Sequence, residues 1–194
     1  MKKKEKNRAS IMSNTEELEY KIEIATQTLD RNLRFITNCD NKISIILTAI
    51  GVLLTIILTN EGINKIFDII KKCLEMKSIS SILYLTCFAG VTLVLIIGLL
   101  ILTSALMAKI PNDHSDKKSS IFFAGINNYD NSKVYNDMFY GLNKRSLLND
   151  LLEQIYINAD IAAIKYKKYN CGVRTTMLGF SLFVVVLIIG IYLY

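Results

Sequence analysis

The feature that most restricts how this chain can fold is an uncharged segment that occupies residues 175–194. These twenty residues contain no Asp, Glu, Lys, Arg or His, and most of them are Leu, Ile, Val or Phe. A helix needs about 20 apolar residues to cross the hydrocarbon core of a bilayer. The segment is therefore predicted to be a transmembrane helix.

The residues before this segment, 143–174, predict a continuation of the same helix in water. Asn143 is a suitable N-cap, and apolar residues then recur every three or four positions among charged ones, from Leu148 to Tyr169. No Pro interrupts residues 143–194, and their glycines are isolated. The sequence therefore predicts one long helix with an amphipathic stalk and a membrane-spanning half.

Two further apolar runs predict two further transmembrane helices, at residues 43–59 and 82–107. The second is 26 residues long, roughly 39 Å against a hydrocarbon thickness of about 30 Å, so it should tilt or protrude. Between them, the 60–81 loop contains an amphipathic stretch. That stretch suits either the membrane surface or packing against the ends of the spans.

The region before the first span resembles the second stalk. Residues 1–13 are basic, begin too far from the first apolar run to be a signal peptide, and are expected to be disordered. Ser13 or Asn14 then caps an amphipathic helix over 14–42, whose apolar face has a heptad-like spacing around polar Asn32. Asn32 either fixes the register of a helix pair or lies at a solvated edge.

The 108–142 segment is predicted to be a polar linker followed by a short helix. The linker contains the single histidine, His114, for which a solvated position outweighs a catalytic one. The apolar stretch SSIFFAGI at 119–126 follows it. A brief helix should then begin after Asp130 or Asn131 and end at Gly141.

Charge distribution predicts the orientation in the membrane. Residues 1–42 and 108–171 hold eighteen Lys and Arg, whereas the 60–81 loop between the first two spans holds four. By the positive-inside rule, the N-terminus and the 108–174 region are cytosolic. The expected fold is an all-α membrane protein with three transmembrane helices and a cytosolic helical head built from two long stalk helices.

The sequence offers little catalytic chemistry. It contains no phosphate-binding glycine loop, zinc-protease or nucleophile-elbow motif, and its four cysteines lack metal-ligand spacing and are interpreted as unpaired thiols. We therefore expect no enzyme activity, cofactor or metal. Charged residues gather where the stalks meet the membrane, which indicates snorkelling and ion pairing or an anion-binding or gating site.

Several short motifs in order resemble the Pycsar transmembrane effector family. They are CDNK at 39–42, SSIFFAGI at 119–126, Tyr135, LLEQI at 151–155, and Lys165 with Tyr166. The resemblance covers about residues 28–190 and departs from the family at Cys39 and Asn41, where Ala and Thr are usual. It implies antiviral defence by abortive infection, in which a cyclic pyrimidine nucleotide, cyclic CMP or cyclic UMP, made by a pyrimidine nucleotide cyclase, activates damage to the cell membrane.

Seven residues are nominated for ligand binding or coupling on the strength of this resemblance and their chemistry. Cationic and amide groups suit an anionic nucleotide, which selects Lys42, Gln154 and Lys165 first. The full set is Asp40, Lys42, Phe122, Phe123, Gln154, Lys165 and Tyr166. A homo-oligomer is expected from the stalk faces and from small residues in the spans.

An alternative function also fits the sequence. The chain would then be a small accessory or structural membrane subunit whose cytosolic stalks bind a partner protein. A neighbouring cyclase gene would favour the effector interpretation over this one.

Overall fold

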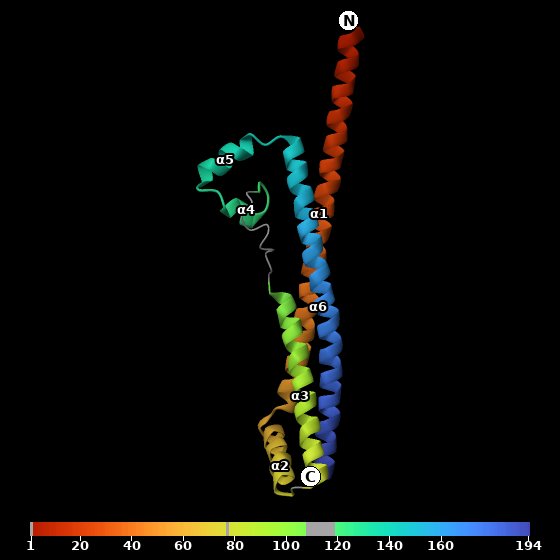
Figure 1. The fold of residues 1–194 in the computed structure, drawn as a ribbon, viewed down its shortest axis with the longest axis vertical. Helices are drawn as coiled ribbons and strands as arrows, with labels where there is room; N and C mark the ends of the chain where they lie inside the picture. The colour runs from red at the N-terminus through yellow and green to blue at the C-terminus, as the bar shows by residue number, and fades with distance from the viewer. Residues whose placement is uncertain (1, 77, 108–118) are drawn as a thin grey trace. The chain divides into compact units, whose positions relative to one another are not determined.

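The computed structural model describes residues 2–76, 78–107 and 119–194, and within these ranges the regular elements are six helices. They are α1 (Lys2–Ile57), α2 (Asn60–Met76), α3 (Ile79–Leu106), α4 (Phe123–Asn127), α5 (Ser132–Tyr140) and α6 (Lys144–Leu193) (Figure 1). The all-α prediction is therefore confirmed. His114 and the rest of the predicted linker lie outside the described residues.

Three of these helices are long and apolar enough to cross a membrane, which confirms the prediction of three spans. They are α3, the part of α1 from Thr15 to Ile57, and α6. α1 and α6 each continue without a break from their amphipathic part into their apolar part, as the absence of helix breakers predicted.

The start of the first helix differs from the sequence prediction. α1 begins at Lys2, so Ser13 and Asn14 lie inside the helix and do not cap its start. The physical reason is that residues 2–14 contain neither Gly nor Pro, and that four Lys and single Glu, Arg, Ala and Met residues among them favour helix. A residue that could cap the start of a helix does not do so when the residues before it also favour helical geometry.

Two predicted helix caps are confirmed. Asn143 accepts a hydrogen bond from the Ser146 backbone N–H at 2.9 Å and so caps α6. Asn131 accepts one from the Val134 N–H at 3.0 Å and caps α5, whose C-cap residue is Gly141. Both satisfy donors that the first turn of a helix leaves unpaired.

The described residues divide into two compact units. Unit 1 takes its residues from the ranges 1–37 and 108–163, and unit 2 consists of Asn38–Met107 and Ile164–Tyr194 without residue 77. α1 and α6 each contribute to both units, α4 and α5 belong to unit 1, and α2 and α3 belong to unit 2.

In unit 1, α1 and α6 lie side by side and run in the same direction. The Asn32 amide donates to the Ile155 carbonyl at 3.2 Å, and Lys144 pairs with Glu19, so contacts advance together along both helices. The predicted heptad face of α1 packs inward, with Ala25 buried. Of the two roles considered for Asn32, the structure shows the cross-helix contact, which sets register.

In unit 2, α1, α3 and α6 pack around two apolar clusters. One contains the buried side chains of Cys39, Ile43, Leu102 and Ala105, and the other contains those of Leu95, Phe183 and Leu187. The apolar side chains on the outside of these helices remain exposed, as at Ile45 (69%) and Leu83 (70%). A surface of this kind suits contact with lipid hydrocarbon.

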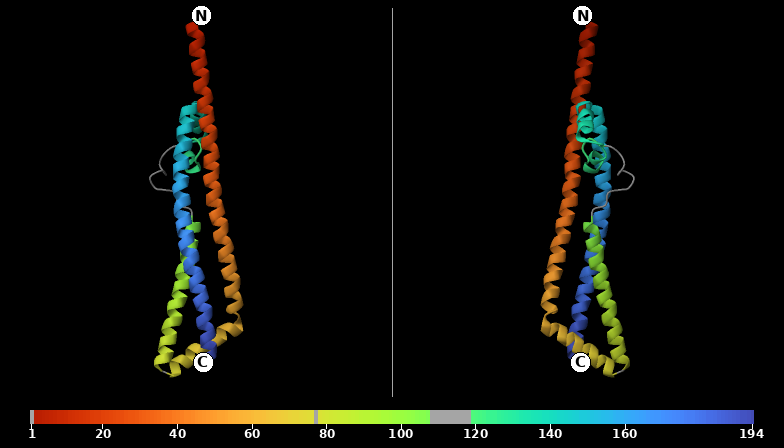
Figure 2. Two further views of the ribbon diagram at one scale, coloured as in Figure 1. Left: turned by 90° about the vertical axis from the view of Figure 1, so that its right-hand side faces the viewer. Right: turned by 90° about the vertical axis from the view of Figure 1, so that its left-hand side faces the viewer.

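α2 joins the ends of two spans and packs against α3. Figure 2 shows it running from the end of α1 to the start of α3. Its side chains Ile69 and Cys73 are buried against Tyr84 and Val186. Of the two alternatives for the 60–81 segment, the structure therefore shows packing on the spans for one face of the helix.

α3 and α6 approach each other closely at glycines. A Cβ atom at Gly98 would lie 2.6 Å from the backbone nitrogen of Thr176, and one at Gly179 would lie 2.8 Å from the Cα atom of Leu95. By contrast, a Cβ atom at Gly51 or Gly90 would meet nothing within 4 Å. Of these four glycines, the close packing of α3 and α6 therefore requires Gly98 and Gly179.

This contrast predicts opposite effects for two identical substitutions. Gly98→Ala should lower the thermal unfolding midpoint in mild detergent, because its methyl group collides with backbone and overpacking costs about 1–3 kcal/mol. Gly90→Ala, on the same helix, should leave the midpoint unchanged or raise it, because Ala favours helix over Gly. Equal shifts for the two variants would contradict the close approach of α3 and α6.

Candidate functional site

The residues nominated from the sequence fall into two groups in the structure. Phe122, Phe123 and Gln154 belong to unit 1, and the other four, Asp40, Lys42, Lys165 and Tyr166, belong to unit 2. Each group is described on its own below.

The polar centre of unit 1 is the carboxylate of Asp150 on α6. It accepts hydrogen bonds from the Ser119 hydroxyl at 2.8 Å, from the Ser120 N–H at 2.7 Å and from the Ser120 hydroxyl. Both serines are buried. Bonds from several donors to one carboxylate are charge-assisted and therefore strong, so Asp150 holds the start of the 119–122 segment on α6.

Aromatic side chains from the α4–α5 region complete this cluster. The Tyr135 hydroxyl donates to the Ser120 carbonyl at 2.9 Å, and its ring lies edge-on to Tyr129 and tilted against Phe139. Partial burial, and secondarily the nearby Asp150 carboxylate, raise the pKa of the Tyr129 hydroxyl above its usual value.

Gln154 lies one turn after Asp150 on α6 and is almost fully buried, at 5% exposure. Its Oε1 atom has no hydrogen-bond partner among the described residues. A spacing of four residues places Gln154 on the same helix face as Asp150. A buried acceptor without a donor costs about 1–3 kcal/mol, so this oxygen is available for an N–H group that is not part of unit 1 as described.

The two phenylalanines lie at the beginning of α4. Phe122 is half-buried and extended, and its N–H donates to the Ser119 hydroxyl at 3.0 Å. Phe123 is the first helical residue, and its side chain lies outside the described part of the structure. Phe122 thus belongs to the segment that Asp150 holds, through the same serine.

In unit 2, Asp40 and Lys165 form an ion pair between α1 and α6. The Lys165 Nζ donates to the Asp40 carboxylate at 2.6 Å, and the two side chains are 10% and 33% exposed. Exposed pairs contribute about 0.2–1 kcal/mol, whereas removal of one partner from a buried pair costs about 3–5 kcal/mol. This pair is partly buried, so its loss should cost an intermediate amount.

The other two nominated residues in unit 2 differ in their surroundings. Tyr166 is half-buried, packs on the cluster around Cys39 and Ile43, and lies edge-on to Tyr169. Lys42 is exposed. A third lysine, Lys168, donates to the backbone carbonyl and the hydroxyl of Ser104 at the end of α3. Polar contacts therefore join α6 to both other spans near the ends of their apolar segments.

The buried acceptor in unit 1 and the ion pair in unit 2 are groups that suit ligand binding and conformational coupling. Among the described residues, no group of three or more His, Cys, Asp or Glu side chains is placed to hold a metal ion. The four cysteines are free thiols, of which Cys39 and Cys73 are buried.

Sequence reasoning missed the cluster around Asp150. It treated Asp150 as one polar residue of an amphipathic helix, and Ser119 and Ser120 entered only as part of a family motif. The signal that was present is the spacing of four between Asp150 and Gln154, which places a second polar side chain on a face that is otherwise apolar at Leu147, Leu151 and Ile157.

Comparison with known proteins places the chain in a family. The sequence profile described as the Pycsar effector protein domain matches residues 24–192, close to the extent of the resemblance seen in the sequence. The Pycsar effector protein GmPycTM from Gulbenkiania mobilis is 31% identical over 176 residues, which are 84% of this chain and 89% of that protein. No solved structure matches. Because the profile includes all three spans and both units, the chain belongs to the Pycsar effector family.

Proposed function

We propose that this protein is the membrane effector of a bacterial antiphage signalling system, which a cyclic pyrimidine nucleotide activates to impair the inner membrane. The proposal rests on the family match over residues 24–192. Family membership implies an antiphage membrane effector, and the three long apolar helices make the protein a multi-pass membrane protein. The activating ligand, cyclic CMP or cyclic UMP, and cell death by abortive infection are the proposed part, and no catalytic step is assigned to the protein.

Unit 1 offers the chemistry that a pyrimidine base requires. Both bases present an N–H donor, on the exocyclic amine of cytosine or on the ring nitrogen of uracil, and the Gln154 Oε1 is a buried acceptor without a donor. The Tyr129 and Tyr135 rings provide aromatic surface in the same unit. We assign Gln154 to recognition of the base edge and Phe122 to the 119–122 segment that Asp150 holds.

α6 provides a route from recognition to the membrane, since one continuous helix contains Gln154, Lys165 and the third span. Asp40 and Lys165 connect α6 with α1 in unit 2, next to the buried cluster around Cys39 and Ile43. We assign this pair to coupling. Lys42 and Tyr166, on the same two helices, belong to the same coupling region.

An effector that kills its host must remain inactive without ligand. A change from about 1:99 to about 99:1 in favour of the active state requires about 5.5 kcal/mol of differential binding. A few charge-assisted hydrogen bonds, at about 1.5–3 kcal/mol each, supply this amount. The ligand therefore needs contacts in the active state that are absent from the inactive one.

The same proposal includes the orientation of the protein in the membrane, its oligomeric state and its functional association with a cyclase. The N-terminus and the 108–174 region face the cytosol, where a pyrimidine nucleotide cyclase would release the ligand. The functional form is a homo-oligomer, for which the small residues in the spans allow close helix contact between protomers. The positive-inside distribution of Lys and Arg supports this orientation.

The first functional prediction concerns Gln154. In cells that co-express a pyrimidine cyclase, wild-type protein should dissipate the membrane potential, and Gln154→Leu should not. Leu is close to Gln in size and removes the unpaired oxygen, so the thermal midpoint of this variant should be equal to or above that of wild type. Tyr156→Leu, at an exposed position of the same helix, should respond as wild type does.

An intact potential in wild-type cells, with cyclic CMP and cyclic UMP both measured as present, would contradict the effector proposal. The accessory-subunit interpretation would then replace it. A Gln154→Leu variant that responds normally would contradict only the assignment of the base site.

The second functional prediction concerns the ion pair between α1 and α6. Asp40→Lys and Lys165→Asp should each alter the nucleotide response of the membrane potential and lower the thermal midpoint, because each places two like charges together. The double variant, which exchanges the two charges, should recover most of both properties. If the double variant is no better than the sum of the single ones, the pair is not the coupling contact.

The third functional prediction concerns orientation. Cys73 is buried, so native thiols do not report on the α2 side, and a variant with all four cysteines replaced by Ala is needed. In spheroplasts, an impermeant maleimide should label Glu75→Cys on α2, an exposed position. It should label Lys133→Cys on α5, also exposed, only after permeabilisation. The opposite pattern would reverse the proposed topology.

A further inference from the structure

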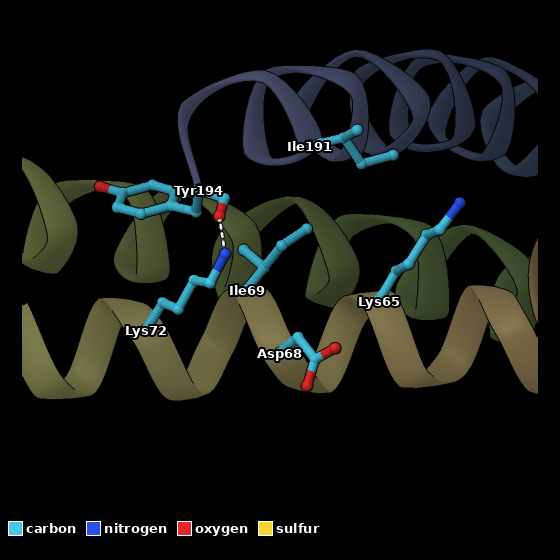
Figure 3. A pocket seen from close by; sticks show the side chains of 6 residues that line it. All are labelled: Lys65, Asp68, Ile69, Lys72, Ile191 and Tyr194. Atoms are coloured by element: carbon cyan, nitrogen blue, oxygen red, sulfur yellow. Dashed lines mark hydrogen bonds between the residues drawn. The ribbon is translucent and has the colours of Figure 1, made fainter.

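A hollow at one end of unit 2 lies between α2 and the last turn of α6. It has a volume of about 210 Å³ and is lined by Lys65, Asp68, Ile69, Lys72, Ile191 and Tyr194 (Figure 3). The share of liquid volume taken by one water is about 30 Å³, so a phosphate group with its ester oxygens fits inside. A second hollow, lined by Glu75, Met76 and Leu193, adjoins it at Lys72 and Tyr194.

Two ammonium groups reach into this hollow from α2. Figure 3 shows the Lys65 and Lys72 side chains extending toward α6, while the Asp68 carboxylate stays beside α2. Lys72 donates to the Tyr194 backbone carbonyl. Lys65 forms no ion pair with any residue that the structure describes. Since an ammonium group has three donors, both lysines retain capacity for an anion.

The position of the hollow corresponds to the boundary of a bilayer. α1 ends at Ile57, α3 begins at Ile79 and α6 ends at Leu193, and α2 connects the first two of these ends (Figure 2). α2 also leaves large apolar side chains exposed, with Phe67 at 65% and Leu74 at 60%. A helix with this composition at the end of three spans lies at the level of the lipid headgroups.

The walls of the hollow combine charge with apolar surface. Two lysines alone would suit any anion, and two isoleucines alone would suit any apolar group. Lys65 and Lys72 are separated by about 10 Å along the helix axis, a distance that their flexible four-carbon stems can close upon one phosphate. Ile69 and Ile191 lie between and opposite them and would contact the first carbons of an acyl chain.

We propose that this hollow binds an anionic phospholipid, with the headgroup phosphate held by Lys65 and Lys72 and an acyl chain against Ile69 and Ile191. Such a lipid would connect α2 with the end of α6 and so stabilise unit 2 in a membrane with anionic lipid. The proposal does not depend on a response to any nucleotide.

The experiment measures thermal unfolding of the purified full chain in a neutral detergent. Phosphatidylglycerol, phosphatidylcholine and inorganic phosphate are each added over the same concentration range. Phosphatidylglycerol should raise the wild-type midpoint, and phosphatidylcholine should not. Lys65→Gln should need about fivefold more phosphatidylglycerol for half of the shift, the effect expected for one lysine at an anionic surface.

The matched control is Lys71→Gln, which removes the same charge from an exposed position on α2 that does not line the hollow. It should keep the wild-type response. Equal loss of response in Lys65→Gln and Lys71→Gln would overturn the proposal, because diffuse surface charge would then explain lipid binding. An equal shift with inorganic phosphate would also overturn it, because the site would then recognise a free anion without its acyl chain.

Lys65 and Lys71 are both exposed, so neither Lys65→Gln nor Lys71→Gln should alter the thermal midpoint in the absence of lipid. If Lys65→Gln changes the midpoint without lipid, the double variant Lys65→Arg with Lys72→Arg tests the lipid site instead. Arg keeps both charges, and phosphatidylglycerol should still raise its midpoint. Failure of this variant to respond would count against a site that is defined by two cations.

Discussion

The exclusion of charge and of unpaired backbone groups from hydrocarbon is the constraint on which the whole structure depends. Helices satisfy the backbone within each span, and the three uncharged segments leave the Asp, Glu, Lys and Arg residues of unit 2 only at or beyond the ends of the spans. Asp40 and Lys165 lie before the apolar parts of α1 and α6, and the lysines of α2 lie after the apolar part of α1. The ion pair of unit 2 and the proposed lipid site therefore lie at these two boundaries, and packing inside the membrane must rely on shape.

Shape separates the three spans into a close pair and a third helix. Gly98 and Gly179 bring α3 and α6 so near that a single added methyl group would meet backbone. α1 joins them differently, through the apolar cluster at Cys39 and Ile43 and through its ion pair, while its Gly51 touches nothing. Side-chain contacts can be exchanged at a lower cost than backbone contacts in a close-packed interior. α1 is thus attached to the other two spans by side-chain contacts, without the close backbone approach that joins α3 and α6.

Sequence patterns predicted what local chemistry determines. The three spans, the caps at Asn131 and Asn143, and the inward face of α1 follow from hydropathy, from side-chain acceptors and from helical period.

The register between α1 and α6 did not follow from the sequence. The predicted stalk ranges, 14–42 and 143–174, do not say which residues face each other, whereas the observed pairs are offset by 125 at Glu19 and Lys144 and at Asp40 and Lys165. Contacts such as Asn32 with the Ile155 carbonyl set this register, and a single sequence carries no signal for a pairing across 123 positions. The same reason hid the bonds between Asp150 and the two serines, which are 30 and 31 positions away.

Two buried oxygen atoms without partners lie on α6, one in each unit: Gln154 Oε1 and Thr176 Oγ1. The absence of a bond at Thr176 is not a property of threonine in these helices. Most other threonines in them donate to the carbonyl four residues earlier, as Thr55, Thr92 and Thr103 do. Thr176 lies where α3 approaches α6 most closely, at Gly98. Leu at 154 or Val at 176 would fill similar space and avoid a cost of about 1–3 kcal/mol for each oxygen. A helix that retains both polar groups has hydrogen-bonding capacity that this state does not use, and a state with ligand at unit 1 or with α3 displaced in unit 2 would use it. The two unsatisfied groups therefore mark the positions on α6 where a ligand at unit 1 or a shift of α3 in unit 2 would meet an unused acceptor.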